Sequence, residues 1–164
     1  MIYLSLGSNL PSKYGNRFDS INFAINLLSD SIIAEFNKSS YFETPSYPDN
    51  KNPKFINVII SINPKNNFDI ENLVRTIFDI EIKMGRIRNK RNEPRVIDID
   101  IIDYYGKILK FKSKELKIIK TPHDCLSLRN FVLYPLMEIC PNWIHPESSM
   151  NITELIDALS DTDK

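Results

Sequence analysis

The sequence VIDIDIIDYY, residues 96–105, has the composition of a β-strand. It is the last strand in the order of strands and helices that predicts the fold class. Alternate side chains of a strand share one face. The isoleucines at alternate positions therefore point into a core, whereas Asp98 and Asp100 stand together on the opposite face, away from the core. We predict a strand with one apolar face and one face that carries two neighbouring carboxylates.

Hydrophobic periodicity before this strand predicts three further strands and two helices. Asp69 and Gly85 are suited to begin and end the second helix. The predicted elements are a strand at 2–6, a helix at 18–28, a strand within 31–44 that enters a long loop at 45–54, a strand at 55–62 and a helix from Asp69 to Gly85. The order β-α-β-β-α-β predicts an α+β protein, a ferredoxin-like sandwich with two helices on one face of an antiparallel sheet.

The last third of the chain is less regular and adds further elements. Residues 105–107 predict a turn into a second apolar-polar stretch that ends near Ile119. Residues 131–140 are mostly apolar but include a proline, and apolar spacing over 152–159 indicates a short amphipathic helix. We therefore expect a single domain, residues 1–164, with an extra C-terminal hairpin and helices.

Composition argues against several protein classes. Lysine plus arginine and aspartate plus glutamate number 21 each, so the zero net charge offers no bulk attraction to nucleic acid or to an anionic membrane. No apolar stretch approaches the roughly 18–20 residues of a membrane span. Cys125 and Cys140 lie outside any metal-ligand spacing, and the N-terminus lacks the pattern of a secretory signal. We expect a cytoplasmic protein without nucleic-acid or membrane partners. A monomer is a separate expectation, which composition does not determine.

Asp98 and Asp100 form the first candidate site. Their Cα atoms would lie about 6.5–7 Å apart along a strand, close enough for the carboxylates to share a pair of Mg²⁺ ions. Mg²⁺ prefers oxygen ligands and usually takes one or two carboxylates together with substrate phosphates. The alternative is a pair of solvated charges on an exposed sheet face, because half-buried strands alternate apolar and polar residues.

A basic loop precedes the acidic pair. From 83 to 95 there is one acidic residue, Glu93, against six basic ones: Lys83, Arg86, Arg88, Lys90, Arg91 and Arg95. Arginine side chains bind phosphate oxygens in pairs, and metal ions held by carboxylates neutralise the same phosphates. By itself such a run is more often a solvated or nucleic-acid-binding surface. Its position directly before Asp98 favours a phosphoryl-transfer site.

Short segments along nearly the whole chain accompany this site. They are LGSNL at 6–10, SYFETP at 40–45, FIN at 55–57, GRIR at 85–88, PH at 122–123 and RNFVLYPL at 129–136. The most specific segment is PRVIDID at 94–100. In this order and spacing, the segments resemble the 6-hydroxymethyl-7,8-dihydropterin pyrophosphokinases of folate biosynthesis. The resemblance implies transfer of the β,γ-pyrophosphoryl group of ATP to the hydroxymethyl oxygen of the pterin, with release of AMP.

The resemblance also implies roles for individual residues. Asp98 and Asp100 would hold two Mg²⁺ ions that bridge the ATP triphosphate, one of them also touching the attacking hydroxyl group. The side chains that would stabilise phosphate charge are Arg86, Arg88, Arg95, His123 and Arg129. The catalytic residues would be Arg86, Arg95, Asp98 and Asp100. Glu81 would support the nucleotide or a metal-bound water. Without the resemblance, a structural role for His123 and a surface position for Glu81 are equally open.

The pterin site is likewise implied by the resemblance. The ring would lie between Phe55 and Phe131, with Asn57 and backbone groups near Thr44 and Tyr47 at its polar edge. On residue type alone, both phenylalanines would be core residues. An amide within an apolar strand is unfavourable unless something hydrogen-bonds to it, which favours a binding role for Asn57.

Four positions depart from the family pattern. At positions 92 and 93 the family usually has a small residue, often preceded by an aromatic one, whereas this chain has Asn92 and Glu93. Glu93 therefore places a carboxylate in the loop that is expected to close over ATP. Val96 replaces a hydroxyl-bearing residue or proline, and Phe78 replaces a polar side chain that contacts the nucleotide. Because loop motions of this kind often limit turnover, we predict a working but slow enzyme.

Three other functions stay open on sequence grounds. A ferredoxin-like nucleic-acid-binding module would use the basic loop, although the chain lacks an RNP1-like aromatic strand and overall basicity. Another Mg²⁺-dependent nucleotidyl or phosphoryl transferase would use the same residues and differ in its products. The third is a catalytically inactive family member, against which the intact aspartates and arginines argue.

Overall fold

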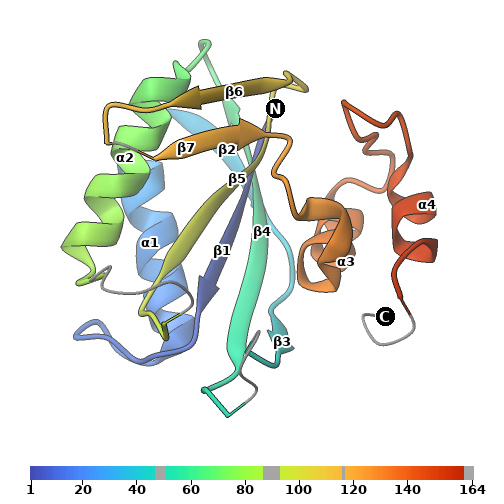
Figure 1. Ribbon diagram of the computed structural model, residues 1–164. Helices are drawn as coiled ribbons and strands as arrows, with labels where there is room; N and C mark the ends of the chain where they lie inside the picture. The colour runs from blue at the N-terminus through green and yellow to red at the C-terminus, as the bar shows by residue number, and fades with distance from the viewer. Residues whose placement is uncertain (47–50, 87–92, 116, 161–164) are drawn as a thin grey trace.

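The computed structural model describes residues 1–46, 51–86, 93–115 and 117–160. The elements are β1 (Ile2–Ser8), α1 (Arg17–Ser31), β2 (Ala34–Lys38), β3 (Phe42–Thr44), β4 (Phe55–Pro64), α2 (Ile70–Lys83), β5 (Asp98–Tyr104), β6 (Leu109–Lys112), β7 (Ile118–Thr121), the 3₁₀ turn η1 (Leu126–Leu128), α3 (Asn130–Ile139) and α4 (Ile152–Asp157). They form three layers, with α1 and α2 on one face of the main sheet and α3 and α4 on the other (Figure 1).

The main sheet has the strand order β2-β4-β1-β5, and each of these pairings is antiparallel. These strands and the two long helices follow the order β-α-β-β-α-β. The helix ends also agree with the sequence: Asp69 accepts a hydrogen bond from Asn72 N at the start of α2, and Gly85 has a φ of 85° just after its end. The prediction of a ferredoxin-like α+β sandwich is confirmed.

The segment 31–44 differs from the predicted single strand that enters a loop. It forms two strands, β2 and β3, which pair with opposite ends of β4. At their junction Ser39 N donates to Ile59 O at 2.9 Å, and Ser39 Oγ accepts from Ile59 N at 3.0 Å. The hydroxyl group of Ser39 replaces a backbone carbonyl as the acceptor for Ile59 N. The edge strand can therefore bend here while the N–H group of Ile59 keeps a partner.

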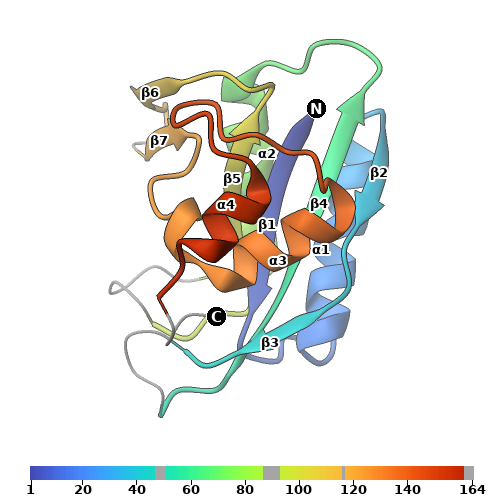
Figure 2. The ribbon, with the colours of Figure 1, turned by 90° about the vertical axis from the view of Figure 1, so that its right-hand side faces the viewer.

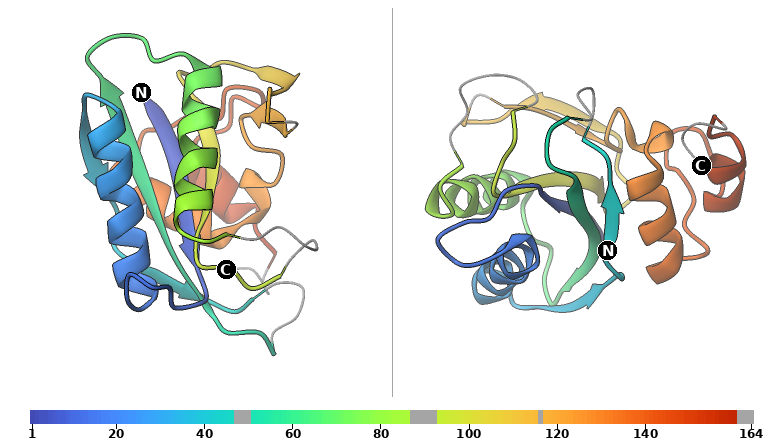
Figure 3. Two further views of the ribbon diagram at one scale, coloured as in Figure 1. Left: turned by 90° about the vertical axis from the view of Figure 1, so that its left-hand side faces the viewer. Right: turned by 90° about the horizontal axis from the view of Figure 1, so that it is seen from below.

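The face under α1 and α2 carries the larger core. Leucines and isoleucines of β1, β4 and β5 pack there against the apolar stripes of both helices, and Ile97, Ile99 and Ile101 point to this side as predicted. Figure 3 shows the two helices side by side across the sheet. Removal of this apolar surface from water is the main force that holds the helices to the sheet.

The opposite face carries a second core, beneath α3 and α4 (Figure 2). Tyr3, Ile59 and Ile102 pack there against Trp143 and the apolar sides of the two helices. The sequence predicted that this side of β5 points away from the core. That prediction is wrong for Ile102, which has no exposed surface.

Helix α3 occupies the segment 131–140, to which the sequence assigned no element. Pro135 lies inside this helix, where it removes one backbone N–H donor. The proline itself, Val132, Leu133 and Leu136 are buried. Burial against the sheet therefore outweighs the weak intrinsic helix preference of the segment.

The predicted turn at 105–107 is present, but the hairpin after it is separate from the main sheet. Tyr105 and Gly106 have φ angles of 54° and 66°. Beyond this turn β6 pairs with β7 rather than with β5, in a two-stranded sheet of its own. The hairpin brings Lys117 and Lys120 to the cleft that contains the start of β5.

Strand register arranges the candidate site residues in rows. Gly7 of β1 pairs with Asn57 of β4 on one side and with Asp98 of β5 on the other. Ser5 pairs with Asp100 in the next row on this face. Because directly paired residues point to the same face, the amide and both carboxylates share the sheet face whose other end is covered by α3 and α4.

Candidate active site

Asp98 and Asp100 lie at the start of β5 on one face of the sheet. Their side chains are 22% and 36% exposed, so both carboxylates reach solvent. The pKa of Asp100 is raised, first because its packed neighbours remove part of the water that would stabilise its charge and second because Asp98 is close. A cation between the two carboxylates would reduce their repulsion.

A turn at the end of α2 places Arg86 against the acidic pair. The N–H groups of Gly85 and Arg86 donate to Ile82 O and Glu81 O, both at 2.9 Å, in a Schellman-type ending that the left-handed glycine permits. The Arg86 guanidinium then contacts both Glu81 and Asp98. Burial acts to lower the pKa of Arg86, but the carboxylates of Asp98 and Glu81 raise it overall, so Arg86 stays cationic.

Arg95 is held beside Asp98 through its backbone. Asn9 Oδ1 accepts from Arg95 N at 2.7 Å, and Asn9 N donates to Arg95 O at 3.1 Å. Asn9 Nδ2 also donates to Pro53 O at 3.1 Å. Arg95 Nε lies 3.3 Å from Asp98 Oδ2. Sequence reasoning assigned Asn9 no role, although an amide in the turn cluster after β1 was the available signal.

His123 and Arg129 approach Asp100 from the segment after β7. His123 N donates to Ile102 O at 3.0 Å, which ties this segment to β5. His123 Nε2 lies 3.8 Å and Arg129 Nη1 3.4 Å from Asp100 Oδ2. His123 Nδ1 accepts a hydrogen bond from Cys125 N at 3.2 Å, which leaves Nε2 facing the carboxylate.

These side chains line one open cleft of about 550 Å³ between α2, β5 and β7. Part of its wall is apolar, from Val74, Ile77, Ile99, Ile101, Ile118 and Ile119. The rest is charged or polar, from Arg86, Arg95, Asp98, Asp100, Lys117, Lys120, His123 and Arg129. The cleft therefore joins most of the predicted phosphate and metal residues, and it adds two lysines to which the sequence assigned no role.

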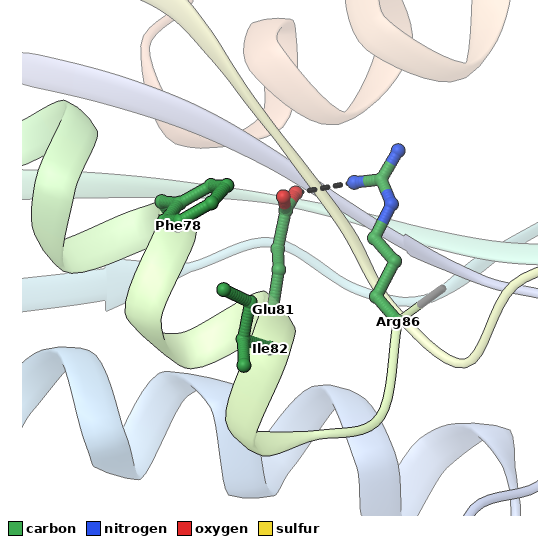
Figure 4. A pocket seen from close by; sticks show the side chains of 4 residues that line it. All are labelled: Phe78, Glu81, Ile82 and Arg86. Carbon is green, nitrogen blue, oxygen red and sulfur yellow. Dashed lines mark hydrogen bonds and ion pairs between the residues drawn. The ribbon is translucent and has the colours of Figure 1, made fainter. Parts of the chain in front are cut away.

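Glu81 is 2% exposed, so the open alternative of a surface acid is wrong. Its Oε1 contacts Arg86 and accepts from Ile99 N at 3.2 Å, while its Oε2 lies 3.0 Å from Lys117 Nζ. Phe78, half-buried on the same helix, lines a small pocket beside Glu81 and Arg86 (Figure 4). An aromatic ring therefore stands where a polar nucleotide contact was expected.

Residues predicted to bind the heterocycle lie across β1 from the acidic pair. Asn57 is buried, and its Nδ2 donates to Thr44 Oγ1 at 2.9 Å. Phe55 is half-buried, with the Arg95 guanidinium 5.4 Å from its ring centre. A Cβ added at Gly7 would come within 3.0 Å of Asn57 Oδ1 and 3.4 Å of the Phe55 ring, so a larger residue would crowd both side chains.

Phe131, the second predicted aromatic residue, lies in the first turn of α3. It is half-buried against the second core, and the Arg129 guanidinium lies 5.6 Å from its ring centre. Glu93 is half-buried. Tyr47 and Arg88, which were also predicted to bind substrates, lie outside the described residues.

His145, Cys125 and Cys140 do not line the cleft. His145 is buried, its Nδ1 accepts from the backbone N–H groups of Glu147 and Ser148 at 3.2 Å, and burial lowers its pKa. Both cysteines are free thiols. Among the described residues, no helix is both long enough and apolar enough to cross a membrane.

The donor set at the acidic pair fits Mg²⁺. Within the described ranges, no group of three or more His, Cys, Asp or Glu side chains could hold a metal ion. Mg²⁺ does not need one, because it commonly binds one or two carboxylates and completes its shell with water and phosphate oxygens. Asp98 and Asp100, in a cleft lined by arginines, meet that requirement.

Paired carboxylates that share a cleft with several arginines are suited to nucleotide-dependent phosphoryl transfer, and this is the class of protein that the fold and the site favour. The family model of 7,8-dihydro-6-hydroxymethylpterin-pyrophosphokinase (HPPK) matches residues 3–141. The chain belongs to this family, as the sequence resemblance indicated.

Curated relatives agree with this assignment. Over 146 residues the chain is 36% identical to the folic acid synthesis protein FOL1 of Dictyostelium discoideum, a match that covers 89% of this chain and 20% of that protein. Over 145 residues it is 33% identical to the 2-amino-4-hydroxy-6-hydroxymethyldihydropteridine pyrophosphokinase of Aquifex aeolicus, covering 88% of this chain and 83% of that protein. The chain therefore spans about a fifth of the first relative and most of the second.

Solved structures share the fold. The crystal structure of a triple mutant of Plasmodium falciparum HPPK-DHPS with STZ-DHP matches 95% of this chain and 42% of that chain, with a TM-score of 0.71 and 15% identity. A structure of HPPK-DHPS in complex with substrates matches 96% of this chain and 44% of that chain, with a TM-score of 0.68 and 14% identity. At this identity the likeness concerns the fold, which it confirms.

Proposed function

We propose that this chain transfers the β,γ-pyrophosphoryl group of ATP to the hydroxymethyl oxygen of 6-hydroxymethyl-7,8-dihydropterin, giving AMP and the pterin diphosphate. The observation that carries the proposal is the strand register, in which Asn57 and Asp98 flank Gly7 from opposite sides. Two strand spacings separate their Cα atoms by about 10 Å. A pterin bound at Asn57 would direct its hydroxymethyl group towards phosphates bound near Asp98. Family membership supports the same reaction.

We infer that Asp98 and Asp100 hold Mg²⁺, with two ions as the proposed number. When bound, the metal would polarise the phosphate oxygens and lower the pKa of the attacking hydroxyl group. The chain's own part is to present two carboxylates from a rigid strand, since β5 is paired with β1 along this stretch. Their mutual proximity and their exposure to the cleft support this assignment.

In the proposed reaction the hydroxymethyl oxygen bonds to the β-phosphorus, and the bond from that phosphorus to the oxygen it shares with the α-phosphate breaks. The hydroxyl proton is released, and negative charge grows on the departing AMP. The groups proposed to neutralise this charge are Arg86, Arg95, His123 and Arg129, which line the cleft, together with Arg88. Preorganised cations suit this task because they need no rearrangement when the charge develops.

For the pterin, we propose stacking between Phe55 and Phe131 and hydrogen bonds from Asn57 and from backbone groups near Thr44 and Tyr47. Both rings are half-buried, so each keeps part of its surface exposed for stacking. A buried amide that already bonds to Thr44 is oriented for recognition of a polar heterocycle edge.

We further propose that residues 1–164 act as one pyrophosphokinase domain, as a monomer in the cytoplasm. Two cores on opposite faces of one sheet support a single folding unit. The free state of both cysteines is consistent with a reducing compartment. Light scattering coupled to size-exclusion chromatography tests the monomer, and a mass of twice 19.1 kDa would contradict it.

A product assay tests the proposed reaction. The chain is incubated with Mg²⁺, ATP and 6-hydroxymethyl-7,8-dihydropterin, and the adenine nucleotides are separated by chromatography, with a control that lacks the pterin. We expect AMP that depends on the pterin. ADP would indicate a simple kinase, and release of inorganic pyrophosphate would indicate nucleotidyl transfer; either product would overturn the proposal. Absence of turnover despite ATP binding would indicate an inactive family member.

A further inference from the structure

Lys117, a residue that the sequence did not single out, faces the buried carboxylate of Glu81. Its Nζ lies 3.0 Å from Glu81 Oε2, and its side chain is 20% exposed. The ammonium group also lies 5.4 Å from the ring centre of Phe78, the aromatic residue that departs from the family pattern. These two contacts orient the lysine on the wall of the cleft, which it helps to line.

The two oxygens of Glu81 serve different partners. Oε1 faces Arg86 and the N–H group of Ile99, and Oε2 faces Lys117. Figure 4 shows Glu81 projecting from α2 between Phe78 and Arg86. Because the side chain is 2% exposed, water does little to stabilise its charge, and the stabilisation comes from these neighbours.

Arg86 is shared between Glu81 and Asp98. The proposed function requires Asp98 to bind a metal ion and Arg86 to bind phosphate, so both contacts of Arg86 must weaken when the nucleotide enters. Glu81 would then lose one cation while it remains buried, and an uncompensated buried carboxylate is strongly unfavourable. Among the described residues, Lys117 is a cation that can stay with it.

We propose that Lys117 is a positioning residue, which keeps Glu81 compensated while Arg86 turns from the carboxylates to the nucleotide phosphates. Lys117 acts through Glu81 and Arg86 rather than by touching the reacting atoms. This inference rests on the proposed function, because it assumes that a metal–nucleotide complex occupies the cleft. It predicts that the need for Lys117 disappears when Glu81 carries no charge.

A double-mutant cycle tests the inference. The variants are Lys117→Met, Glu81→Gln and the double variant, with Lys117→Arg as the conservative control. Calorimetry measures the dissociation constant for the Mg²⁺ complex of an ATP analogue with a methylene group between the α- and β-phosphates. Thermal unfolding of each variant shows whether it is folded at the titration temperature.

We expect Lys117→Met to weaken binding of the analogue about tenfold in the wild-type background, and less than about twofold in the Glu81→Gln background. Lys117→Arg should restore most of the affinity, because it restores the charge. Equal weakening in both backgrounds would mean that Lys117 contacts phosphate directly, and no weakening in either would mean that it is dispensable; both results overturn the inference.

Failure of the inference and failure of the proposed function remain distinguishable. A wild-type chain that binds the analogue with the expected coupling but forms no AMP supports Lys117 as a positioning residue and contradicts the reaction. AMP formation without coupling between Lys117 and Glu81 supports the reaction and contradicts the role of Lys117 as a positioning residue. A wild-type chain that does not bind the analogue at all contradicts both.

Discussion

The two ends of β5 share one sheet face and have opposite properties. At the acidic end, Asp98 and Asp100 are 22% and 36% exposed and are surrounded by cations. At the covered end, Ile102 has no exposed surface and packs under α3 and α4. The charged cleft at Asp100 and the closed core at Ile102 are therefore only two positions apart along the strand.

The difference arises mainly from what lies over the strand, although a β-bulge at Ile102 also shifts the alternation of side chains at the covered end. Helices α3 and α4 cross one end of the face, as Figure 2 shows, and their apolar sides bury Ile102. At the acidic end Gly7 lies between Asn57 and Asp98 in one row, and its lack of a side chain leaves room for the Asn57 amide and the Phe55 ring. A covered end gives rigidity to the strand, and an uncovered end keeps its polar groups available for binding.

The largest expected effect is the loss of turnover at the acidic end. Asp98→Ala and Asp100→Ala should each lower kcat by roughly 10²- to 10³-fold or more, because each removes charge that would hold the metal ion. Neither side chain belongs to a core cluster, so the fold should survive. Product assays and thermal unfolding measure the two properties separately. A large fall in Tm with either variant would instead mark these aspartates as structural.

The matched substitution at the covered end should have the opposite outcome. Ile102→Ala should reduce the free energy of unfolding by about 2–5 kcal/mol, because it leaves a cavity in the second core. Well below the unfolding temperature, kcat per folded molecule should stay within a few-fold of the wild type. Denaturant titration measures the stability change, and a loss of turnover in fully folded protein would contradict the separation of the two ends.

Asn57→Ala should affect the pterin and leave the nucleotide unchanged. Loss of the buried amide removes hydrogen bonds to the heterocycle, so the KM for the pterin should rise about tenfold or more. The KM for ATP should not change, since Asn57 lies across β1 from Asp98. Steady-state kinetics with each substrate varied in turn measures both constants. Equal rises in both would place Asn57 in a purely structural role.

Glu93→Gly tests whether the atypical loop slows the enzyme. Removal of a carboxylate near bound phosphates should raise ATP affinity or turnover by about two- to fivefold, the scale of one partly exposed charge pair. Glu93→Gln separates charge from backbone freedom. Unchanged ATP affinity and unchanged turnover in both variants would show that Glu93 does not face the nucleotide.

The smallest expected effect is a pH dependence of stability from the second core. Burial lowers the pKa of His145 in the folded state, so the unfolded chain binds the proton more readily below its ordinary pKa of about 6.5. Stability should therefore fall as the pH drops from about 6.5 towards the folded-state pKa. His145→Asn keeps an acceptor for the N–H groups of Glu147 and Ser148 but cannot titrate, so it should flatten this dependence in denaturant titrations. An unchanged pH profile in this variant would assign the effect to other groups.

Sequence reasoning recovered what depends on local pattern. Alternation along 96–105 correctly separated the isoleucines of the main core from the aspartates, and capping signals located the ends of α2. It predicted C-terminal helices but did not locate α3, because Pro135 opposes helix formation locally, while the packing that stabilises the helix comes from distant strands.

The site shows the same limit. Motif resemblance found residues from distant segments that the structure brings into one cleft, including Arg86, His123 and Arg129. It could not find Lys117, whose significance depends on a contact with Glu81 across 36 residues of chain. Nor could it assign Asn9, which acts through the backbone of Arg95. Roles that arise from tertiary contact have no signal in local sequence.

The most direct test of the acidic end is the Mg²⁺ dependence of nucleotide binding. Calorimetry of the α,β-methylene ATP analogue, with Mg²⁺ and with EDTA, would compare the wild type with Asp98→Asn and Asp100→Asn. We predict that Mg²⁺ tightens binding to the wild type at least about tenfold, and that this advantage disappears in both variants while their Tm values stay close to that of the wild type. An undiminished Mg²⁺ advantage in the folded variants would contradict the assignment of the metal site to β5.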